Sequence, residues 1–429
     1  MNYDQTLDYL YSLLPAYHRI GKAAYKDNLD NTLALDAYFG HPHNNYKTIH
    51  IAGTNGKGSV AHMLASVLQE AGLRTGLYTS PHLRDFRERI RVNGEMIPED
   101  EVIGFVEKHR DIINKTSPSF FELTVAMAFY YFDQANVDIA VIETGLGGRL
   151  DSTNIIIPVL SVITNVGHDH MDLLGDTLEK VASEKAGIIK QNIPVIIGES
   201  QKETDHIFRQ KAEEKGSPVF CANKYYECTF TDKEMNGKLR EFRIKNMKEG
   251  TVFKGVTPLG GDYQCSNIGT LFMICDHLKG VYNFDTDIIL RGISGVVKNT
   301  GLKGRWQILG NKPLIICDTG HNMEGFQYTM KQLVKLPAER IHIVIGFVAD
   351  KDLSMILPLF PKKASYYFTR ASVPRALDEK ILKSIAADYG LLGNSFDNVA
   401  EALDSAVVNA GGKDVIFIGG STFVVADIT

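Results

Sequence analysis

A glycine-rich segment with a single lysine is the first candidate for chemistry in this sequence. Residues 50–60 read HIAGTNGKGSV, where an apolar run ends at Ala52 and a helical stretch follows Ser59. A strand that enters such a turn before a helix points backbone N–H groups at an anion, and a lysine adds positive charge. The usual phosphate loop places Lys directly before Ser or Thr, whereas here a glycine separates Lys57 from Ser59. The segment predicts a phosphate site of unusual geometry, with an ordinary glycine-rich turn as the alternative.

A carboxylate at the end of a strand-like run is the second candidate. Glu143 follows the run VDIAVI and precedes a loop with three glycines. Ligands of open parallel sheets bind outside the carboxyl ends of the strands, and magnesium takes one or two carboxylates together with phosphate oxygens. Glu143 is therefore a candidate magnesium ligand, with a helix cap or a surface pair as the alternative. Arg149 and Asp151 are expected to pair with each other or with the loop backbone.

Histidines and aspartates crowd the loop after the next apolar run. The segment ITNVGHDHMDLLG contains His168, Asp169, His170 and Asp172. Such a cluster suggests a metal, yet magnesium seldom takes imidazole and zinc needs more soft ligands. The spacing leaves metal binding and an ordinary polar loop as alternatives.

The helical stretch DTLEKVASEKAGIIK contains Lys185 among small residues. A lysine in this setting most often lies on a solvated helix face. If the amine is buried instead, its pKa falls and it becomes a nucleophile. It would then react with carbon dioxide to give a carbamate, an anionic metal ligand.

A serine and several arginines follow another strand-like run. In LYTSPHL, Ser80 precedes a proline, so its hydroxyl is a candidate metal ligand or part of a Ser-Pro turn. The next segment, RDFRERIRV, contains Arg84, Arg87, Arg89 and Arg91. These arginines form either a solvated amphipathic edge or a clamp for a carboxylate-bearing substrate.

The second half of the chain offers a further polar segment, IICDTGHNMEG. Asp318 ends a strand-like run, and His321 with Asn322 opens a helix. A carboxylate there suits ribose hydroxyls and an imidazole could touch phosphate, with helix capping as the alternative for each. Arg305, in GRWQIL, receives no role from spacing alone.

Short apolar runs alternate with helical patterns from residue 47 onward. The runs KTIHIAG, RTGLYTS, VDIAVIETG, PVLSVITNVG and NIPVIIG are rich in Val and Ile. Helical patterns lie near 58–71, 99–115, 121–134 and 177–190. Continuous apolar strands with helical crossovers predict an α/β fold in which a mostly parallel sheet, carrying the phosphate loop, has helices on both faces.

The remaining segments indicate a second domain. Residues 222–258 alternate polar and apolar residues around an Asn236-Gly237 turn, which predicts a small antiparallel excursion. Helical patterns resume at about 265–280 and 285–297. From residue 313, the strands PLIICD, IHIVIGF, ASYYFTR and DVIFIGG alternate with helices near 322–335, 352–360, 375–389 and 397–410. We expect domains at 1–297 and 298–429, the second being smaller and Rossmann-like, with a joint at 292–306.

Composition restricts the class of protein. The chain has 429 residues and a net charge of −5, which argues against a general nucleic-acid surface. No stretch reaches the roughly 18 apolar residues that a membrane span needs, and no signal pattern opens the chain. The five cysteines form no CxxC pair, so we expect reduced thiols and a cytoplasmic location.

Together, seven segments make the sequence resemble the folylpolyglutamate synthase and dihydrofolate synthase family of the Mur ligase superfamily. They are GTNGKGS, TSPHL, ETGLGGRLDSTN, HDHMDLLG, SEKAGI, GRWQ and DTGHN, in the order that the family has. The family often shows Asp-Gly-Ala-His-Asn-Pro where this chain has the residues from Asp318 to Met323. The C-terminal GGSTFVVADIT is a weaker match and leaves the glutamate contacts unassigned.

The resemblance implies a role for each matched residue. The ATP phosphates are expected on Gly53, Thr54, Asn55, Gly56, Lys57, Gly58 and Ser59, with Lys57 at the β/γ end. Two magnesium ions are expected, one on Ser80 and Glu143, the other on His170 and a carboxylated Lys185. Nucleotide contacts from the domain seam are expected of Asn267 and Arg305, ribose contacts of Asp318, and phosphate contacts of His321. The pterin substrate is expected near His82, Arg87 and Arg89.

The resemblance also implies the reaction. The family joins L-glutamate to a folate-type carboxylate, dihydropteroate or a tetrahydrofolate polyglutamate, through an acyl phosphate with release of ADP and phosphate. Closure of the second domain about a joint near 292–304 would exclude water. The implied protein is a monomer that binds small molecules, not nucleic acid or membranes. The alternatives are a nucleotide-binding regulatory protein and a peptidoglycan-type Mur ligase. Ligases of the second kind usually carry a nucleotide-sugar domain ahead of the phosphate loop, whereas only 52 residues precede Gly53 here.

Overall fold

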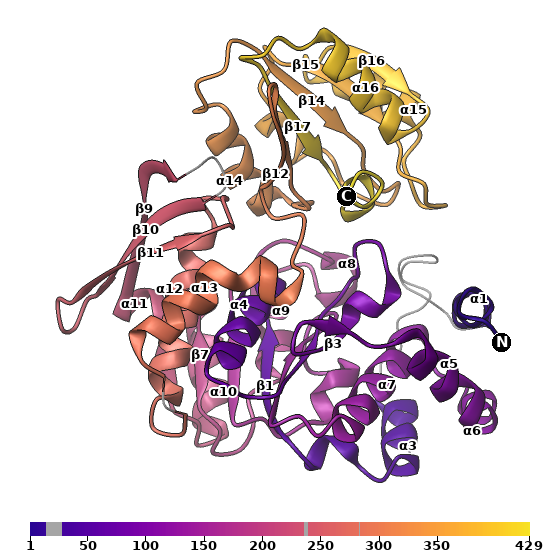
Figure 1. The fold of residues 1–429 in the computed structure, drawn as a ribbon, viewed down its shortest axis with the longest axis vertical. Helices are drawn as coiled ribbons and strands as arrows, with labels where there is room; N and C mark the ends of the chain where they lie inside the picture. Colours follow the sequence, from indigo (N-terminus) through magenta and orange to yellow (C-terminus); the bar gives the residue numbers. More distant parts are fainter. Residues whose placement is uncertain (14–27, 236–238, 283) are drawn as a thin grey trace. The chain divides into compact units, whose positions relative to one another are not determined.

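The structure, a computed structural model, describes residues 1–13, 28–235, 239–282 and 284–429 (Figure 1). Contacts divide the chain into two compact units. The first unit comprises residues 1–229, 242–256 and 265–301, and the second comprises 230–241, 257–264 and 302–429. Each unit contains its own sheet with mainly parallel strands, so each is described separately.

The first unit contains an eight-stranded sheet in the order β4-β3-β2-β5-β1-β6-β7-β8. The parallel strands are β2 (Thr75–Tyr78), β5 (Ile139–Glu143), β1 (Lys47–Ala52), β6 (Leu160–Ile163), β7 (Val195–Ile197) and β8 (Val219–Cys221). The antiparallel edge consists of β3 (Ile90–Val92) and β4 (Glu95–Met96). All of β1 after Lys47 is buried, as expected for a parallel strand covered on both faces.

Two long helices of the first unit pack closely together. They are α4 (Lys57–Glu70) and α13 (Thr286–Thr300). A Cβ atom on Gly292 would lie 2.5 Å from Val67 Cγ2, so only glycine permits this approach. The Ser66 hydroxyl also donates to the Gly292 carbonyl at 2.7 Å. Residues 292–300, which the sequence analysis placed in a joint, are therefore helical, because they pack against α4.

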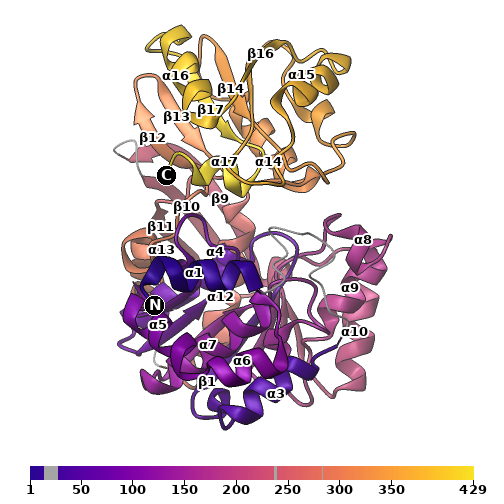
Figure 2. The same cartoon turned by 90° about the vertical axis from the view of Figure 1, so that its right-hand side faces the viewer.

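Two clusters of buried apolar side chains cover the sheet of this unit. One joins β5 to α5 (Glu99–Lys108) and α7 (Phe120–Gln134), and the other joins β6 and β7 to α9 (Leu178–Ala186) and α10 (Asp205–Glu214). Figure 2 shows α9 and α10 lying side by side. The prediction of a single helix near 99–115 is wrong in detail. The helix is interrupted at His109, and a second helix, α6 (Arg110–Thr116), follows.

The excursion expected at 222–258 forms a separate sheet of three strands in the order β11-β10-β9. The strands are β9 (Tyr226–Met235), β10 (Leu239–Asn246) and β11 (Val252–Thr257). The Asn236-Gly237 turn lies outside the described residues. Among its described residues, the first unit also has the helices α1 (Tyr3–Leu13), α3 (Asp30–Tyr38), α8 (Met171–Leu174), α11 (Ala222–Tyr225) and most of α12 (Gln264–Leu278), with 3-10 turns at Pro42–Asn44, Phe86–Arg89 and Ser152–Ile155.

The second unit contains a six-stranded sheet in the order β12-β13-β17-β14-β15-β16. Its strands are β12 (Gln307–Asn311), β13 (Leu314–Cys317), β17 (Val415–Gly419), β14 (Ile341–Ile345), β15 (Ser365–Thr369) and β16 (Gly393–Phe396). Only β12 runs antiparallel to its neighbour. The helices are α14 (Met323–Leu333), α15 (Glu379–Asp388), α16 (Val399–Asn409) and α17 (Thr422–Ala426).

Two parallel-dominated sheets with covering helices confirm the predicted α/β class. The helix expected at 352–360 is wrong, because that segment contains only a 3-10 turn at Leu357–Leu359. Pro358 lies within this turn and Pro361 lies two residues after it, and proline lacks the N–H that would continue a helix.

Candidate active site

Four neighbouring strands bring the candidate residues to one edge of the first sheet. β1 pairs with β5 so that Ile51 lies opposite Glu143, and β2 pairs with β5 just before Ser80. β6 pairs with β1 on its other side and leads into residues 164–170. The phosphate-loop segment therefore lies between a carboxylate and a polar loop, at the edge where open parallel sheets bind ligands.

The loop between β1 and α4 is held by the segment after β6. The Thr54 N–H donates to the Asn165 carbonyl at 3.0 Å, and the Asn55 N–H donates to Asn165 Oδ1 at 2.9 Å. Two of the seven loop amides expected to face phosphate thus have partners within the chain. At the start of α4, helix geometry leaves N–H groups without intrahelical acceptors, and this is where an anion would bind. The sequence analysis missed Asn165, whose type and position gave no signal.

Gly56 has a backbone that favours glycine and a close neighbour. Its φ of 86° lies in the left-handed region, and a Cβ there would lie 2.3 Å from Asn267 Oδ1. Asn267 is on α12 and is buried. The two residues, far apart in the sequence, therefore meet at the start of α4, while the nucleotide contact expected of Asn267 stays a prediction.

We expect Gly56→Ala to lower the free energy of unfolding by more than Gly72→Ala does. Gly72 lies just after the other end of α4 with a φ of 84°, but a Cβ there meets nothing within 4 Å. Both variants incur left-handed strain of about 1–2 kcal/mol, and Gly56→Ala adds overpacking of about 1–3 kcal/mol. Urea unfolding of both variants measures the difference. Equal losses would show that Asn267 does not restrict this turn.

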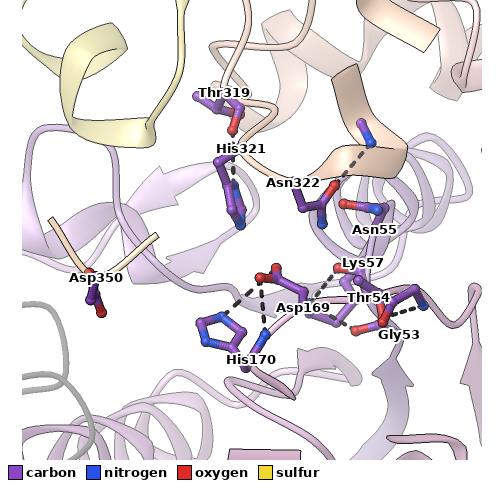
Figure 3. A network of polar contacts seen from close by, with 12 residues as sticks. Gly53, Thr54, Asn55, Lys57, Asp169, His170, Thr319, His321, Asn322 and Asp350 are labelled. Carbon is purple, nitrogen blue, oxygen red and sulfur yellow. Dashed lines mark hydrogen bonds and ion pairs between the residues drawn. The ribbon is translucent and has the colours of Figure 1, made fainter. Parts of the chain in front are cut away.

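Two lysine amines converge on one backbone carbonyl. Lys57 Nζ donates to the Gly53 oxygen at 3.0 Å and to the Thr54 oxygen at 3.2 Å, and Lys185 Nζ donates to the Gly53 oxygen at 3.1 Å (Figure 3 labels the loop residues). The solvated position preferred for Lys185 is therefore wrong, since α9 turns this side chain inward and leaves it 3% exposed. Burial, and then repulsion by Lys57, lowers the pKa of Lys185 to about 7. A substantial share of this amine is therefore neutral and nucleophilic near pH 7.

The metal candidates provide oxygen donors rather than a preformed cage. Glu143 is buried, and its Oε2 accepts a hydrogen bond from the Ser80 N–H at 3.2 Å, so the carboxylate lies beside the serine. Within the described part of the chain, no group of three or more His, Cys, Asp or Glu side chains could hold a metal. A sparse set of this kind fits magnesium, which keeps waters and binds substrate phosphates.

The polar loop after β6 is compact. His170 has a left-handed φ of 52°, and its N–H donates to Asp169 Oδ1 at 3.1 Å (Figure 3). The Asp169 side chain is buried and its charge acts on Lys185. The side chain of Asp172 lies outside the description.

Arg149 and Asp151, in the loop after β5, have different partners and do not pair with each other. Asp151 accepts hydrogen bonds from the N–H groups of Gly145 and Leu146, both at 2.8 Å. This is the expected pairing with the loop backbone. Arg149 instead pairs with Glu184 on α9, with Nη2 2.8 Å from Oε1. Burial raises the pKa of Asp151, so these donors compensate a costly carboxylate.

The arginine-rich segment after β2 separates into unlike members. Arg87 forms ion pairs with Asp85 at 2.7 Å and Glu99 at 3.2 Å, so a substrate carboxylate would have to compete for it. Arg89 is buried, and its Nε donates to His82 Nδ1 at 2.8 Å. An arginine donor at Nδ1 requires the neutral His82 tautomer with its proton on Nε2. The expectation of a solvated edge is therefore wrong for Arg89.

The second unit brings its candidates to the end of β13. Asp318 is buried and accepts hydrogen bonds from Tyr263, Trp306 and Gly320. Arg305 donates to the Thr319 hydroxyl. Figure 3 shows the His321 ring, whose Nδ1 lies 3.2 Å from the Thr319 carbonyl, and Asn322, which caps α14 through the Gly325 N–H. The sequence analysis missed Tyr263, which lies 55 residues from Asp318 in the chain.

The chain is similar to known proteins along most of its length. Residues 51–274 match the Mur ligase middle domain, and residues 304–422 match the Mur ligase glutamate ligase domain. A Bacillus subtilis dihydrofolate synthase/folylpolyglutamate synthase is 34% identical over 421 residues, covering 95% of each chain. A Haloferax volcanii probable bifunctional folylpolyglutamate synthase/dihydropteroate synthase is 30% identical, and this chain spans 50% of its length.

Solved structures have the same fold over nearly the full length. The Escherichia coli FolC structure in complex with DHPP and ADP has a TM-score of 0.84 at 29% identity and covers 100% of this chain and 97% of that one. The Yersinia pestis bifunctional folylpolyglutamate synthase/dihydrofolate synthase complexed with AMPPNP and Mn ion has a TM-score of 0.84 at 25% identity, with the same coverage. Among the described residues, no helix is both long and apolar enough to cross a membrane.

Proposed function

Because this chain belongs to the folylpolyglutamate synthase and dihydrofolate synthase family of Mur ligases, we propose that it joins L-glutamate to a folate-type carboxylate with conversion of ATP to ADP and phosphate. The acceptor is dihydropteroate, a tetrahydrofolate polyglutamate, or both. The observation that carries the proposal for this chain is the convergence of Lys57 and Lys185 on the Gly53 carbonyl, directly after β1. Lys57 would supply positive charge there, and Lys185 would supply an amine whose pKa is lowered to about 7, beside the place where a terminal phosphoryl group would be transferred.

The reaction needs an activated acid. A carboxylate does not react with an amine at neutral pH, because its leaving group would be oxide. Transfer of the γ-phosphoryl group gives an acyl phosphate, whose leaving group is phosphate. The glutamate amine then attacks the acyl carbon, the amide forms and phosphate departs. Charge develops on the transferring oxygens, and Lys57 together with the α4 amides would stabilise it.

A divalent cation completes the phosphate site in our proposal. Ser80 and Glu143 would hold one magnesium ion, and His170 with a carbamate of Lys185 would hold a second. When bound, these ions neutralise phosphate oxygens and stabilise the charge that develops in transfer. The buried Glu143 beside Ser80 fits this role because magnesium takes one or two carboxylates together with phosphate oxygens. The Mn ion and AMPPNP in the Yersinia pestis structure support a divalent metal with ATP.

The remaining residues would bind nucleotide and acceptor. Arg305, Asp318 and His321 would bind ribose and phosphate, and His82 with Arg89 would approach the pterin acid. Arg87 is a weaker candidate because of its two carboxylate partners. We assign ATP-phosphate binding to residues 1–297, and glutamate binding together with the nucleotide contacts of Arg305, Asp318 and His321 to residues 298–429, in a monomer.

The experiment that tests the function is an ADP-release assay. We expect release only when ATP, L-glutamate and a pterin acid are all present, with dihydropteroate and a reduced folate tried in turn. A regulatory nucleotide-binding protein would release ADP at the same rate without glutamate. A peptidoglycan-type ligase would ignore both pterin acids and accept a nucleotide-sugar acid instead.

A further inference from the structure

The carboxylate of Asp318 is nearly saturated with hydrogen bonds. Its Oδ2 accepts the Tyr263 hydroxyl at 2.6 Å and the Trp306 N–H at 2.8 Å, and its Oδ1 accepts the Gly320 N–H at 2.7 Å. The side chain is 2% exposed, and these three donors together with the charge of Arg305 compensate its burial.

Counting acceptor positions shows what remains for a ligand. Each carboxylate oxygen has two lone-pair positions, so Oδ2 is full and Oδ1 has one position left. A ribose presents two neighbouring hydroxyl donors. In the conformation described, Asp318 can therefore accept one ribose hydroxyl but not the pair.

We propose that the Tyr263 hydroxyl occupies on Asp318 the position that a ribose hydroxyl takes, so that nucleotide binding displaces Tyr263 and this contact sets nucleotide affinity. The inference rests on the proposed function, because it assumes that Asp318 binds ribose. The Tyr263 hydroxyl thus competes with the ribose hydroxyl for the same acceptor position on Asp318.

Tyr263 is the one of these three donors that can leave without moving the backbone. Trp306 and Gly320 donate through backbone N–H groups. Trp306 is further restricted, because its φ of 48° lies in the left-handed region and its ring is buried. A tyrosine side chain, by contrast, turns about two torsions.

The backbone beside Tyr263 is anchored independently of the phenol. The segment 258–263 lies between β11 and α12, and the Asp262 N–H donates to Gln332 Oε1 at 2.7 Å. Gln332 in turn donates to the Gly260 carbonyl at 2.8 Å. The side chain can therefore rotate away while the segment stays attached to α14. Burial, and then the charge of Asp318, raises the pKa of Tyr263, so the phenol stays protonated as a donor.

The chain contains a built-in reporter for this exchange. Trp306 is its single tryptophan, and a Cβ on Gly260 would lie 2.8 Å from Trp306 Cδ1. The indole therefore contacts the segment that carries Tyr263. The backbone N–H of the same residue, Trp306, donates a hydrogen bond to Asp318. Displacement of Tyr263 should change the intrinsic fluorescence of the protein.

The test is a titration of the full chain with ADP, followed by tryptophan fluorescence and calorimetry. Tyr263→Phe removes the competing hydroxyl and keeps the ring, so ADP should bind about tenfold more tightly, as expected for removing a competing hydrogen bond to a charged acceptor. With 2′,3′-dideoxy-ADP, which lacks the ribose hydroxyls, parent and variant should bind equally. Equal or weaker binding of ADP by Tyr263→Phe would overturn the proposal.

Two controls separate this inference from the proposed function. Tyr226→Phe removes a matched phenol–carboxylate contact, to Asp276 in the first unit, and should leave ADP affinity unchanged. Asp318→Asn should weaken ADP binding in either Tyr263 background, and unchanged binding would overturn both the ribose assignment and the role of Tyr263. If the parent chain failed to bind ADP at all, the proposed function itself would fall.

Discussion

Lys185→Ala should reduce ligation by about 10²–10³-fold, the loss expected when a charge-stabilising group is removed, and added formate or acetate should restore part of the rate. The reason is the proposed carbamate of Lys185. Its amine is buried, its pKa is lowered to about 7, and it lies 3.1 Å from the Gly53 carbonyl. A short carboxylate would enter the space left by the side chain and replace the missing anionic oxygens. Initial rates with and without added carboxylate measure the effect.

A matched lysine provides the control for this rescue. Lys190 is partly buried, its amine donates to the Asn154 carbonyl at 2.7 Å, and burial lowers its pKa to about 8. Lys190→Ala should therefore affect stability to a similar degree without any rescue by carboxylates. If Lys185→Ala kept the parent rate, or if formate restored both variants equally, the carbamate would have no support.

Lys57→Met should abolish most ATP-dependent turnover while leaving the fold intact. The side chain is only partly buried, and its amine contacts two carbonyls of its own loop, so the fold depends little on it. In the transfer step the same amine would contact phosphate oxygens, and loss of one such donor in a preorganised site costs about 10²–10³ in rate. Methionine keeps the stem length and removes the charge. Single-turnover ADP formation measures the loss.

Lys47→Met is the appropriate comparison. Lys47 lies at the other end of β1 and is exposed, so its removal changes net charge by the same amount without touching the loop. It should turn over at the parent rate, with an unchanged melting temperature. A Lys57→Met chain that turned over as fast as Lys47→Met would contradict a role for the loop lysine.

Local patterns in the sequence predicted the elements of this fold well. The apolar runs near residues 47–52 and 139–143 became β1 and β5, since buried parallel strands are short and continuous. The prediction of a helix at 352–360 is wrong. The apolar residues there are spaced as in a helix, but Pro358 and Pro361 prevent one from forming. Periodicity detects which residues are apolar, but it does not detect missing backbone donors.

The candidate site was predictable only where its residues are close in sequence. The loop at Gly53–Ser59 could be read directly, because its glycines and lysine are contiguous. The burial of Lys185 could not, since it depends on the Gly53 carbonyl 132 residues away. For the same reason spacing could not separate Arg87 from Arg89, whose different environments depend on Glu99 and His82.

The central claim is that ATP phosphorylates the pterin acid itself before glutamate attacks. The most direct test uses an acceptor whose carboxylate is labelled with ¹⁸O, followed by mass analysis of the inorganic phosphate released. If an acyl phosphate forms, one labelled oxygen leaves the acid with each phosphate, so the product phosphate should carry ¹⁸O in step with amide formation. Unlabelled phosphate, released while the amide accumulates, would contradict the account.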